Sequence, residues 1–285
     1  MRDAAALLLC AFATFGAAAQ EVRLEFVAAS GEFLGNPHDL KLSPDGRYLF
    51  VADVDKDRVA ILDPKTLAML GEFGADHQDG THDIDFDRQG RAYVADTHNN
   101  RVAVYEIKGM RAKFVGEFDE RIRGPEGVLA HPNGRIYVAG AWSGNVVAYR
   151  NGKLVAELTG LSSPHDLELA ANGDIWLADA GNSRLLLLTP DLEIIRELGR
   201  RKYGFDGVRY LDLTAGGILI AADKNNHVVK FIGADGKLLQ VLGDGRAGKG
   251  PGRFTTPEGV ELRGEELWLS DSGNNRIVKY RLEVE

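Results

Sequence analysis

The sequence has little cysteine, little proline and no excess of positive charge. Its single cysteine, Cys10, can form no internal disulfide and no cysteine-based metal site. Lysine and arginine number 34 against 42 aspartate and glutamate residues, for a net charge of −8. Such a chain lacks the basic surface that nucleic-acid binding requires, so we expect no nucleic-acid partner. Glycine, in contrast, exceeds its usual share, with 34 residues, and this excess predicts many tight turns.

The one long apolar run lies at the N-terminus. Residues 1–19 combine a basic start with an apolar stretch from Ala4 to Phe15 and small residues that end at Ala19. This pattern is typical of a secretory signal peptide, and the apolar stretch is too short to span a membrane. We therefore predict a cleaved signal peptide over 1–19, a single domain over 20–285 and a periplasmic or secreted location with no membrane span.

The remainder of the chain repeats one unit six times. The repeats begin 44, 44, 39, 41 and 52 residues apart, at Pro37-His38-Asp39-Leu40, Thr81-His82-Asp83-Ile84, Pro125-Glu126-Gly127-Val128, Pro164-His165-Asp166-Leu167, Phe205-Asp206-Gly207-Val208 and Pro257-Glu258-Gly259-Val260. Each opening is followed by a turn, a short run of aromatic and β-branched residues, and a polar loop such as 96–101. Four short strands per unit of about 44 residues predict an all-β fold, a six-bladed β-propeller.

The two ends of the chain predict how the ring closes. The sixth repeat stops at Glu285 after three strands, whereas residues 22–28 have strand character but no repeat of their own. We expect this N-terminal segment to supply the missing outer strand of the last blade. Closure would protect strand edges that an open array leaves exposed.

The repeated unit resembles the NHL repeat over residues 37–285. The resemblance rests on the openings together with the strand-and-loop pattern of segments such as 92–102, Ala-Tyr-Val-Ala-Asp-Thr-His-Asn-Asn-Arg-Val. It implies that the first strand of each blade is innermost. The repeat openings then surround the central channel, on the face that also holds the loops between second and third strands.

The second residue of each opening is a potential metal ligand or proton carrier. Alternate blades offer two sets, and the first, a His₂Glu set that suits zinc, consists of His82, His165 and Glu258. The second is more calcium-like and consists of His38, Glu126 and Asp206. His98 and Trp142 add possible ligand contacts on the same face, and an exposed tryptophan can stack on a ligand. Alternatively, these positions are polar only because they cap strands at a solvated rim.

Two classes of function fit this pattern. The first is a binding module whose channel mouth, with or without a divalent metal, recognises a small molecule, a peptide or a protein. The second is a metal-dependent lyase or hydrolase. The Pro-His-Asp openings resemble those of peptidyl-α-hydroxyglycine α-amidating lyases, which implies zinc at His82 and His165, with Glu258 in place of a third histidine. A gluconolactonase-like reading implies calcium, with Glu126 or Glu258 as first ligand.

Overall fold

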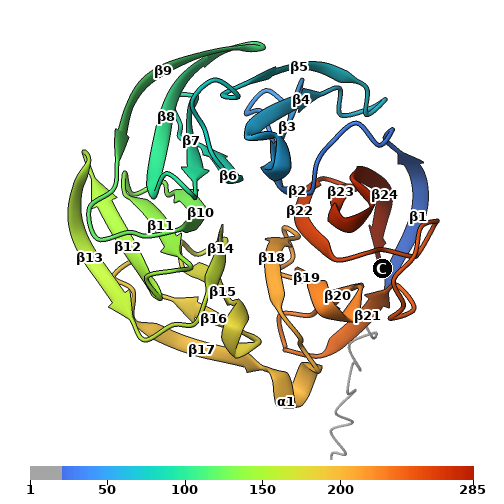
Figure 1. Cartoon of the computed structure of the whole chain (residues 1–285). Helices are drawn as coiled ribbons and strands as arrows, with labels where there is room; N and C mark the ends of the chain where they lie inside the picture. Colours follow the sequence, from blue (N-terminus) through green and yellow to red (C-terminus); the bar gives the residue numbers. More distant parts are fainter. Residues whose placement is uncertain (1–20) are drawn as a thin grey trace, which may run out of the picture.

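Six four-stranded antiparallel sheets stand around a common axis in the computed structural model, which describes residues 21–285 (Figure 1). The predicted all-β, six-bladed β-propeller is thereby confirmed. The expected signal peptide, residues 1–19, lies outside the described residues. Within residues 21–285, no helix is long and apolar enough to cross a membrane.

Each of the first five blades takes its strands in chain order from the axis outward. The strands of these blades are β2 (Pro37–Leu42), β3 (Leu49–Asp53), β4 (Arg58–Leu62) and β5 (Met69–Phe73); β6 (Thr81–Phe86), β7 (Arg91–Asp96), β8 (Arg101–Lys108) and β9 (Arg111–Phe118); β10 (Pro125–Ala130), β11 (Ile136–Gly140), β12 (Asn145–Arg150) and β13 (Lys153–Thr159); β14 (Pro164–Leu169), β15 (Ile175–Asp179), β16 (Arg184–Leu188) and β17 (Ile194–Gly199); β18 (Val208–Leu213), β19 (Leu219–Asp223), β20 (Val228–Ile232) and β21 (Leu238–Leu242). Four short 3-10 helices and one α-helix complete the described elements: η1 (Val54–Lys56), η2 (Ala180–Asn182), η3 (Lys224–Asn226), η4 (Ser272–Asn274) and α1 (Arg200–Tyr203).

The sixth blade joins the two ends of the chain. Its inner strands are β22 (Pro257–Arg263), β23 (Glu266–Asp271) and β24 (Arg276–Val284), and its outer strand is β1 (Val22–Ala29). Strand β1 pairs antiparallel with β24, from Val22 opposite Val284 to Ala29 opposite Val278. The predicted closure of the last blade by the N-terminal strand is confirmed.

The hydrophobic core lies between neighbouring blades. In one example Phe50 and Ile61 of the first blade pack against Val94 and Tyr105 of the second, and all four are buried. The described residues form six such clusters, one at each junction between blades. Because each sheet buries both faces against its neighbours, its inner strands are almost uniformly buried.

A carboxylate at the end of the second strand organises most of the loops on one face. In the second blade, Asp96 accepts a hydrogen bond from the Arg101 guanidinium at 2.6 Å and another from the backbone N–H of Asp79 at 2.8 Å. It thereby ties the loop between the second and third strands to the loop that enters the blade. The Asp-to-Arg spacing that the sequence repeats therefore has a structural role.

In the fifth blade, the inner strand begins later than the sequence pattern predicts. Val208 pairs with Asp223 in the fifth blade as Pro37 pairs with Asp53 in the first. The opening is therefore Val208-Arg209-Tyr210-Leu211, three residues later than predicted. Asp206 instead lies in the entering loop, where its N–H donates to Asp223 at 2.7 Å. Its predicted position at the channel is wrong. The Asp-Gly-Val sequence at 206–208 imitates an opening, while Arg209 occupies the channel position.

Candidate functional site

The inner strands place three levels of side chains around the axis. The level at the mouth, here called the mouth ring, consists of His38, His82, Glu126, His165, Arg209 and Glu258. The middle level consists of Asp39, Asp83, Gly127, Asp166, Tyr210 and Gly259, and the third level includes Lys41, Asp85, Glu168, Asp212 and Glu261. Seven of the eight predicted site residues lie in or beside the mouth ring, and Asp206 does not.

Two carboxylates of the middle level bind their blades to the next. Asp83 accepts a hydrogen bond from the Val128 N–H at 2.6 Å, and Asp166 accepts one from the Leu211 N–H at 2.7 Å. These N–H groups belong to innermost strands, which have no further strand to pair with. A buried backbone N–H requires a partner, so these aspartates are structural.

Tyr210 crosses the channel between the mouth ring and the third level. Its hydroxyl donates to the carbonyls of His82 and Glu126, each at 3.2 Å, in blades on the far side of the axis. The ring is fully buried, and this burial raises the pKa of the Tyr210 hydroxyl well above its usual value. Tyr210 therefore remains a neutral hydrogen-bond donor at physiological pH.

The third level is an internal ion network. Lys41 lies 3.0 Å from Glu168 and 3.7 Å from Glu261. Burial raises the pKa of Asp85 to about 6 and that of Glu261 to about 7, although Lys41 opposes both shifts. Asp85 and Glu261 also accept backbone N–H groups from the next blade at 2.8 and 3.0 Å. Their oxygens are thus already engaged in holding blades together.

His82 in the mouth ring is fixed in one tautomer. Its Nδ1 atom lies 2.7 Å from the Gly80 carbonyl and 2.8 Å from the Thr97 hydroxyl, which itself donates to the Pro125 carbonyl. Nδ1 must therefore carry a proton, which leaves Nε2 as the basic nitrogen. Burial lowers the pKa of His82, even though Glu126 partly opposes the shift. At neutral pH the ring is an uncharged base.

His165 forms a close pair with Glu126. Its Nδ1 atom lies 2.7 Å from the Ser163 carbonyl, and its Nε2 atom lies 2.6 Å from Glu126 Oε2. Burial alone would raise the pKa of Glu126, but His165, His82 and Arg209 outweigh it and hold the pKa far below its usual range. Glu126 is therefore an anion next to an imidazole, an arrangement able to share or transfer a proton.

Three cationic or potentially cationic groups lie close to Glu258. Its Oε1 atom lies 2.6 Å from Lys224 Nζ, 3.6 Å from Arg209 Nη1 and 3.8 Å from His38 Nε2. Glu258 is fully buried, whereas the side chains of Arg209 and Lys224 are 25 and 23% exposed. The two cations thus connect the buried carboxylate with solvent. Burial lowers the pKa of His38 well below its usual value, and the neighbouring His82 and Arg209 add to this effect.

Five buried polar atoms of the mouth ring have no hydrogen-bond partner. They are His38 Nδ1, Glu126 Oε2, His165 Nε2 and both carboxylate oxygens of Glu258. Two of the close contacts described above, Glu126 to His165 and Glu258 to Lys224, bring atoms within 2.6 Å without the alignment of a hydrogen bond. Unsatisfied buried groups are rare in folded proteins and concentrate at functional sites.

The donor atoms of the mouth ring have the right chemistry for a divalent metal, but their arrangement does not provide a ready site. Imidazole nitrogen and carboxylate oxygen are suitable zinc ligands. Within residues 21–285, however, no group of three or more His, Cys, Asp or Glu side chains is placed to hold a metal ion. The close contacts join His165 to Glu126 and His38 to Glu258, rather than His82, His165 and Glu258 to one point.

The rim of the mouth carries the other two predicted ligand contacts. His98 has its ring centroid 6.3 Å from that of His82 and 5.8 Å from that of Trp142. Trp142 is half exposed. Both side chains belong to loops between second and third strands, as predicted.

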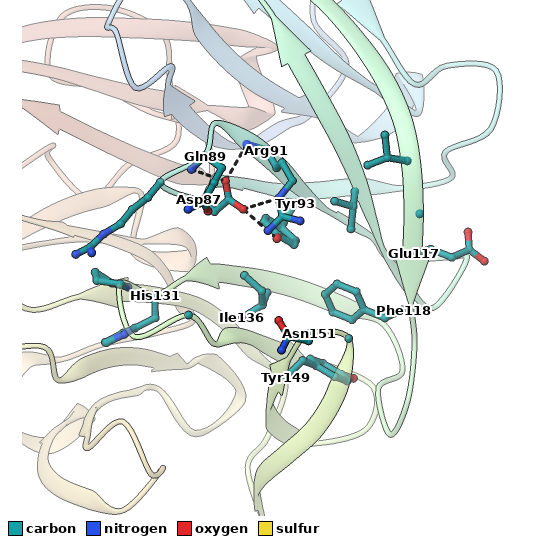
Figure 2. A pocket seen from close by; sticks show the side chains of 17 residues that line it. Asp87, Gln89, Arg91, Tyr93, Glu117, Phe118, His131, Ile136, Tyr149 and Asn151 are labelled. Atoms are coloured by element: carbon teal, nitrogen blue, oxygen red, sulfur yellow. Dashed lines mark hydrogen bonds and ion pairs between the residues drawn. The ribbon is translucent and has the colours of Figure 1, made fainter.

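A cavity of about 500 Å³ lies away from the mouth ring, between the second and third blades (Figure 2). Its walls include Tyr93, Phe118 and Tyr149, and the turns between first and second strands border it on the opposite face. Its carboxylate Asp87 already binds Arg91 and Tyr93 (Figure 2). None of its lining side chains is among the buried polar groups that lack a hydrogen-bond partner, whereas four side chains of the mouth ring are, so the mouth ring is the better candidate.

Sequence reasoning missed four residues of the site: Thr97, Arg209, Tyr210 and Lys224. A signal for two of them was present, because an opening at Val208 lies 44 residues after Pro164, the spacing that separates the first three openings. The other two lie in variable loop positions, and only their contacts with His82 and Glu258 reveal them.

The comparisons with known proteins agree with the fold. The NHL repeat model matches residues 82–105. No curated protein matches the sequence. A catalytically inactive histidine-to-alanine variant of virginiamycin B lyase from Staphylococcus aureus, with quinupristin, is similar in structure at 13% identity and a TM-score of 0.64, covering 92% of this chain and 99% of that one.

Two further solved structures are similar. PQQ-bound aldose sugar dehydrogenase from Streptomyces coelicolor has 12% identity and a TM-score of 0.68, and covers 92% of this chain and 99% of that one. A gluconolactonase-like protein has 16% identity and a TM-score of 0.69, and covers 94% of both chains. At these identities the likeness shows the fold alone. The chain thus carries an NHL repeat within a six-bladed β-propeller.

Proposed function

We propose that this propeller binds a small polar ligand at its mouth ring. The observation that carries the proposal is the set of five unpartnered buried polar atoms on His38, Glu126, His165 and Glu258. Leaving such groups without partners costs stability, and proteins accept that cost at sites where a ligand supplies the partners.

The charges around these atoms indicate what the ligand presents. Glu126 and Glu258 offer oxygens that accept hydrogen bonds, while Arg209 and Lys224 offer donors that are partly exposed. A ligand with several hydroxyl groups can donate to the first pair and accept from the second. The negative net charge of the chain disfavours a strongly anionic ligand.

The proposal is tested with a thermal-shift screen of residues 20–285 against monosaccharides, disaccharides, sugar lactones, hydroxy acids and dipeptides. We expect at least one compound class to raise the melting temperature by several degrees, since a ligand at 100 times its Kd stabilises by about 2.7 kcal/mol. The Glu126→Gln variant should lose the shift. Asp206→Ala is the matched control, because Asp206 lies on the same face but outside the mouth ring, and should keep it.

Two results would overturn the proposal. One is a screen in which no compound stabilises the wild-type protein. The other is a stabilising compound that acts equally on the wild type and on Glu126→Gln, because such a compound binds somewhere else.

A second candidate function, a lyase or hydrolase that moves a proton, is favoured by the fixed tautomer of His82. Its Nδ1 atom is held by Gly80 and Thr97, so Nε2 is a preformed base, and the His165–Glu126 pair can return a proton. Quinupristin and glucono-δ-lactone are suitable first substrates, chosen from the names of the structural neighbours.

Turnover should depend on His82. Because burial lowers the pKa of His82 from its usual value, the rate should rise with pH only on the acidic side and stay flat through neutrality. Absence of turnover with both substrates, or full activity in His82→Ala, argues against this candidate.

Binding of a divalent metal at the mouth ring and export of the chain from the cytoplasm are separate proposals, and each has its own test. Elemental mass spectrometry of untagged protein, with His82→Ala beside it, measures whether zinc or calcium is bound in stoichiometric amount. Cell fractionation measures whether residues 1–19 direct the chain out of the cytoplasm, as their signal-peptide pattern predicts.

A further inference from the structure

Two stacked aromatic rings lie at the rim beside the mouth ring. His98 and Trp142 occupy equivalent loop positions in the second and third blades, each two residues after the second strand ends. Each covers a glycine of the entering loop: a Cβ added to Gly80 would lie 2.7 Å from the His98 ring, and one added to Gly124 would lie 2.4 Å from the Trp142 ring. Both glycines have positive φ angles, 64 and 55°. The rings therefore rest directly on backbone.

The two rings are stacked with each other, and both stay partly exposed. The His98 side chain is 48% exposed and Trp142 is 50% exposed. Their planes differ by 18°, with centroids 5.8 Å apart. We call this pair the aromatic shelf. Of the three tryptophans, Trp142 is the exposed one, since Trp176 and Trp268 are 5 and 1% exposed.

The aromatic shelf continues into the mouth ring and has a polar edge. His98 and His82 have ring centroids 6.3 Å apart. Asp79 Oδ1 lies 2.7 Å from His98 Nδ1, and the Asp79 side chain is 58% exposed. The shelf thus combines the exposed Trp142 ring with a carboxylate and an imidazole at one edge.

We propose that the ligand is a carbohydrate that extends out of the mouth ring and stacks one sugar ring on the aromatic shelf. This inference rests on the proposed function of the mouth ring. A sugar ring has an apolar C–H face that packs against a π face, and hydroxyl groups at its edge that donate to carboxylate and imidazole. A purely aromatic ligand would match the faces of His98 and Trp142 but leave Asp79 unused.

The test uses residues 20–285 and a glycan array of defined mono- and oligosaccharides, followed by calorimetric titration of the best glycan. We expect Trp142→Ala to weaken binding about tenfold and Trp142→Phe by less than about threefold, because phenylalanine keeps a stacking face. Bound glycan should also protect wild-type tryptophan fluorescence from quenching by acrylamide, since only the exposed Trp142 is accessible to the quencher.

The outcomes separate the proposal for the mouth ring from the proposal for the aromatic shelf. A glycan whose affinity falls in both Glu126→Gln and Trp142→Ala supports the mouth ring and the shelf together. A glycan whose affinity falls in Glu126→Gln but is unchanged in Trp142→Ala overturns only the proposal that a sugar ring stacks on the aromatic shelf. Indole-3-acetate, titrated beside the glycans, is the aromatic probe without sugar hydroxyl groups. Absence of glycan binding, or binding of indole-3-acetate in place of any glycan, overturns the proposal that the ligand is a carbohydrate. A thermal-shift hit of another chemical class would then leave the mouth ring standing.

Discussion

Two glycines decide how closely neighbouring blades approach at the channel. A Cβ on Gly127 would lie 1.9 Å from the carbonyl oxygen of His165, and one on Gly259 would lie 2.3 Å from that of His38. These contacts are with backbone, which cannot move without shifting a whole blade. The residues that follow Glu126 and Glu258 are therefore glycine for steric reasons.

Replacing either glycine by alanine should destabilise the fold markedly. We expect Gly127→Ala and Gly259→Ala to lower the free energy of unfolding by about 1–3 kcal/mol or more, because the added methyl group overpacks the junction. Chemical denaturation measures the loss. Gly71→Ala is the control, since nothing lies within 4 Å of its added Cβ, and it should be close to neutral. Equal effects at Gly127 and Gly71 would contradict the packing argument.

The residues of the mouth were predictable where the repeat is regular. His38, His82, Glu126, His165 and Glu258 follow from their position in the opening, because strand pairing fixes which side chains face the axis. Their mutual contacts were not predictable. Whether His165 approaches Glu126 or joins a metal site depends on differences of a few ångströms that a repeat pattern does not contain.

At the scale of the element, the inner strand β18 shows how a local match can mislead. The sequence alignment placed Asp206 at the channel, whereas the pairing with β19 places Arg209 and Tyr210 there. Gly207, directly before the strand, has a φ of 70°, like Gly80 at 64° before the inner strand of the second blade. Strand pairing is a non-local property, so the entering loop alone could not fix it.

This register can be tested through stability. Tyr210→Phe removes a hydroxyl that binds two carbonyls and should lower the free energy of unfolding by about 1 kcal/mol. Tyr210→Ala leaves a cavity in the channel and should cost about 3–5 kcal/mol. Asp206→Ala should change stability by no more than about 0.5 kcal/mol. Urea denaturation of the three variants checks the order, and a larger loss at Asp206 than at Tyr210 would contradict the register.

At the scale of the whole molecule, the first strand holds the ring closed. Strand β1 pairs with β24 along its length, and Glu21 and Glu285 exchange two backbone hydrogen bonds at 3.0 Å. A variant lacking residues 21–29 should expose the outer edge of β24 and lose cooperative unfolding or aggregate. Calorimetry and light scattering measure this. A truncated chain that melts like the full-length one would contradict the closure.

The third level should make stability depend on pH. The folded-state pKa values of Asp85 and Glu261, about 6 and about 7, lie above their ordinary values of 3.8 and 4.5. The folded state therefore binds more protons than the unfolded state, and the free energy of unfolding should fall as pH rises from about 4.5 to about 7.

The Glu261→Gln variant should flatten this slope, while Glu265→Gln, at an exposed position, should not. Denaturation midpoints at pH 5, 6 and 7 give the comparison. Equal slopes in the wild type and in Glu261→Gln would contradict this assignment. The comparison of the two proteins cancels the opposite contribution of His38 and His82, whose lowered pKa values favour the folded state as pH rises.

The architecture was predictable as a whole because it is repeated. Six copies of one pattern specify six blades, and an incomplete last copy with a spare N-terminal strand specifies the closure. What could not be predicted is the content of the channel below the mouth, where Lys41 lies among carboxylates of other blades. Those contacts join residues more than a hundred positions apart and exist only once the ring has closed.

The central claim is that the mouth ring is a ligand site, and calorimetric titration of the best compound from the thermal-shift screen tests it most directly. The account predicts stoichiometric binding to the wild type and to Asp206→Ala, and binding at least about tenfold weaker in Glu126→Gln. The reason is that a buried Glu126 oxygen makes no aligned hydrogen bond in spite of its close contact with His165. Equal affinity in all three proteins would contradict the claim.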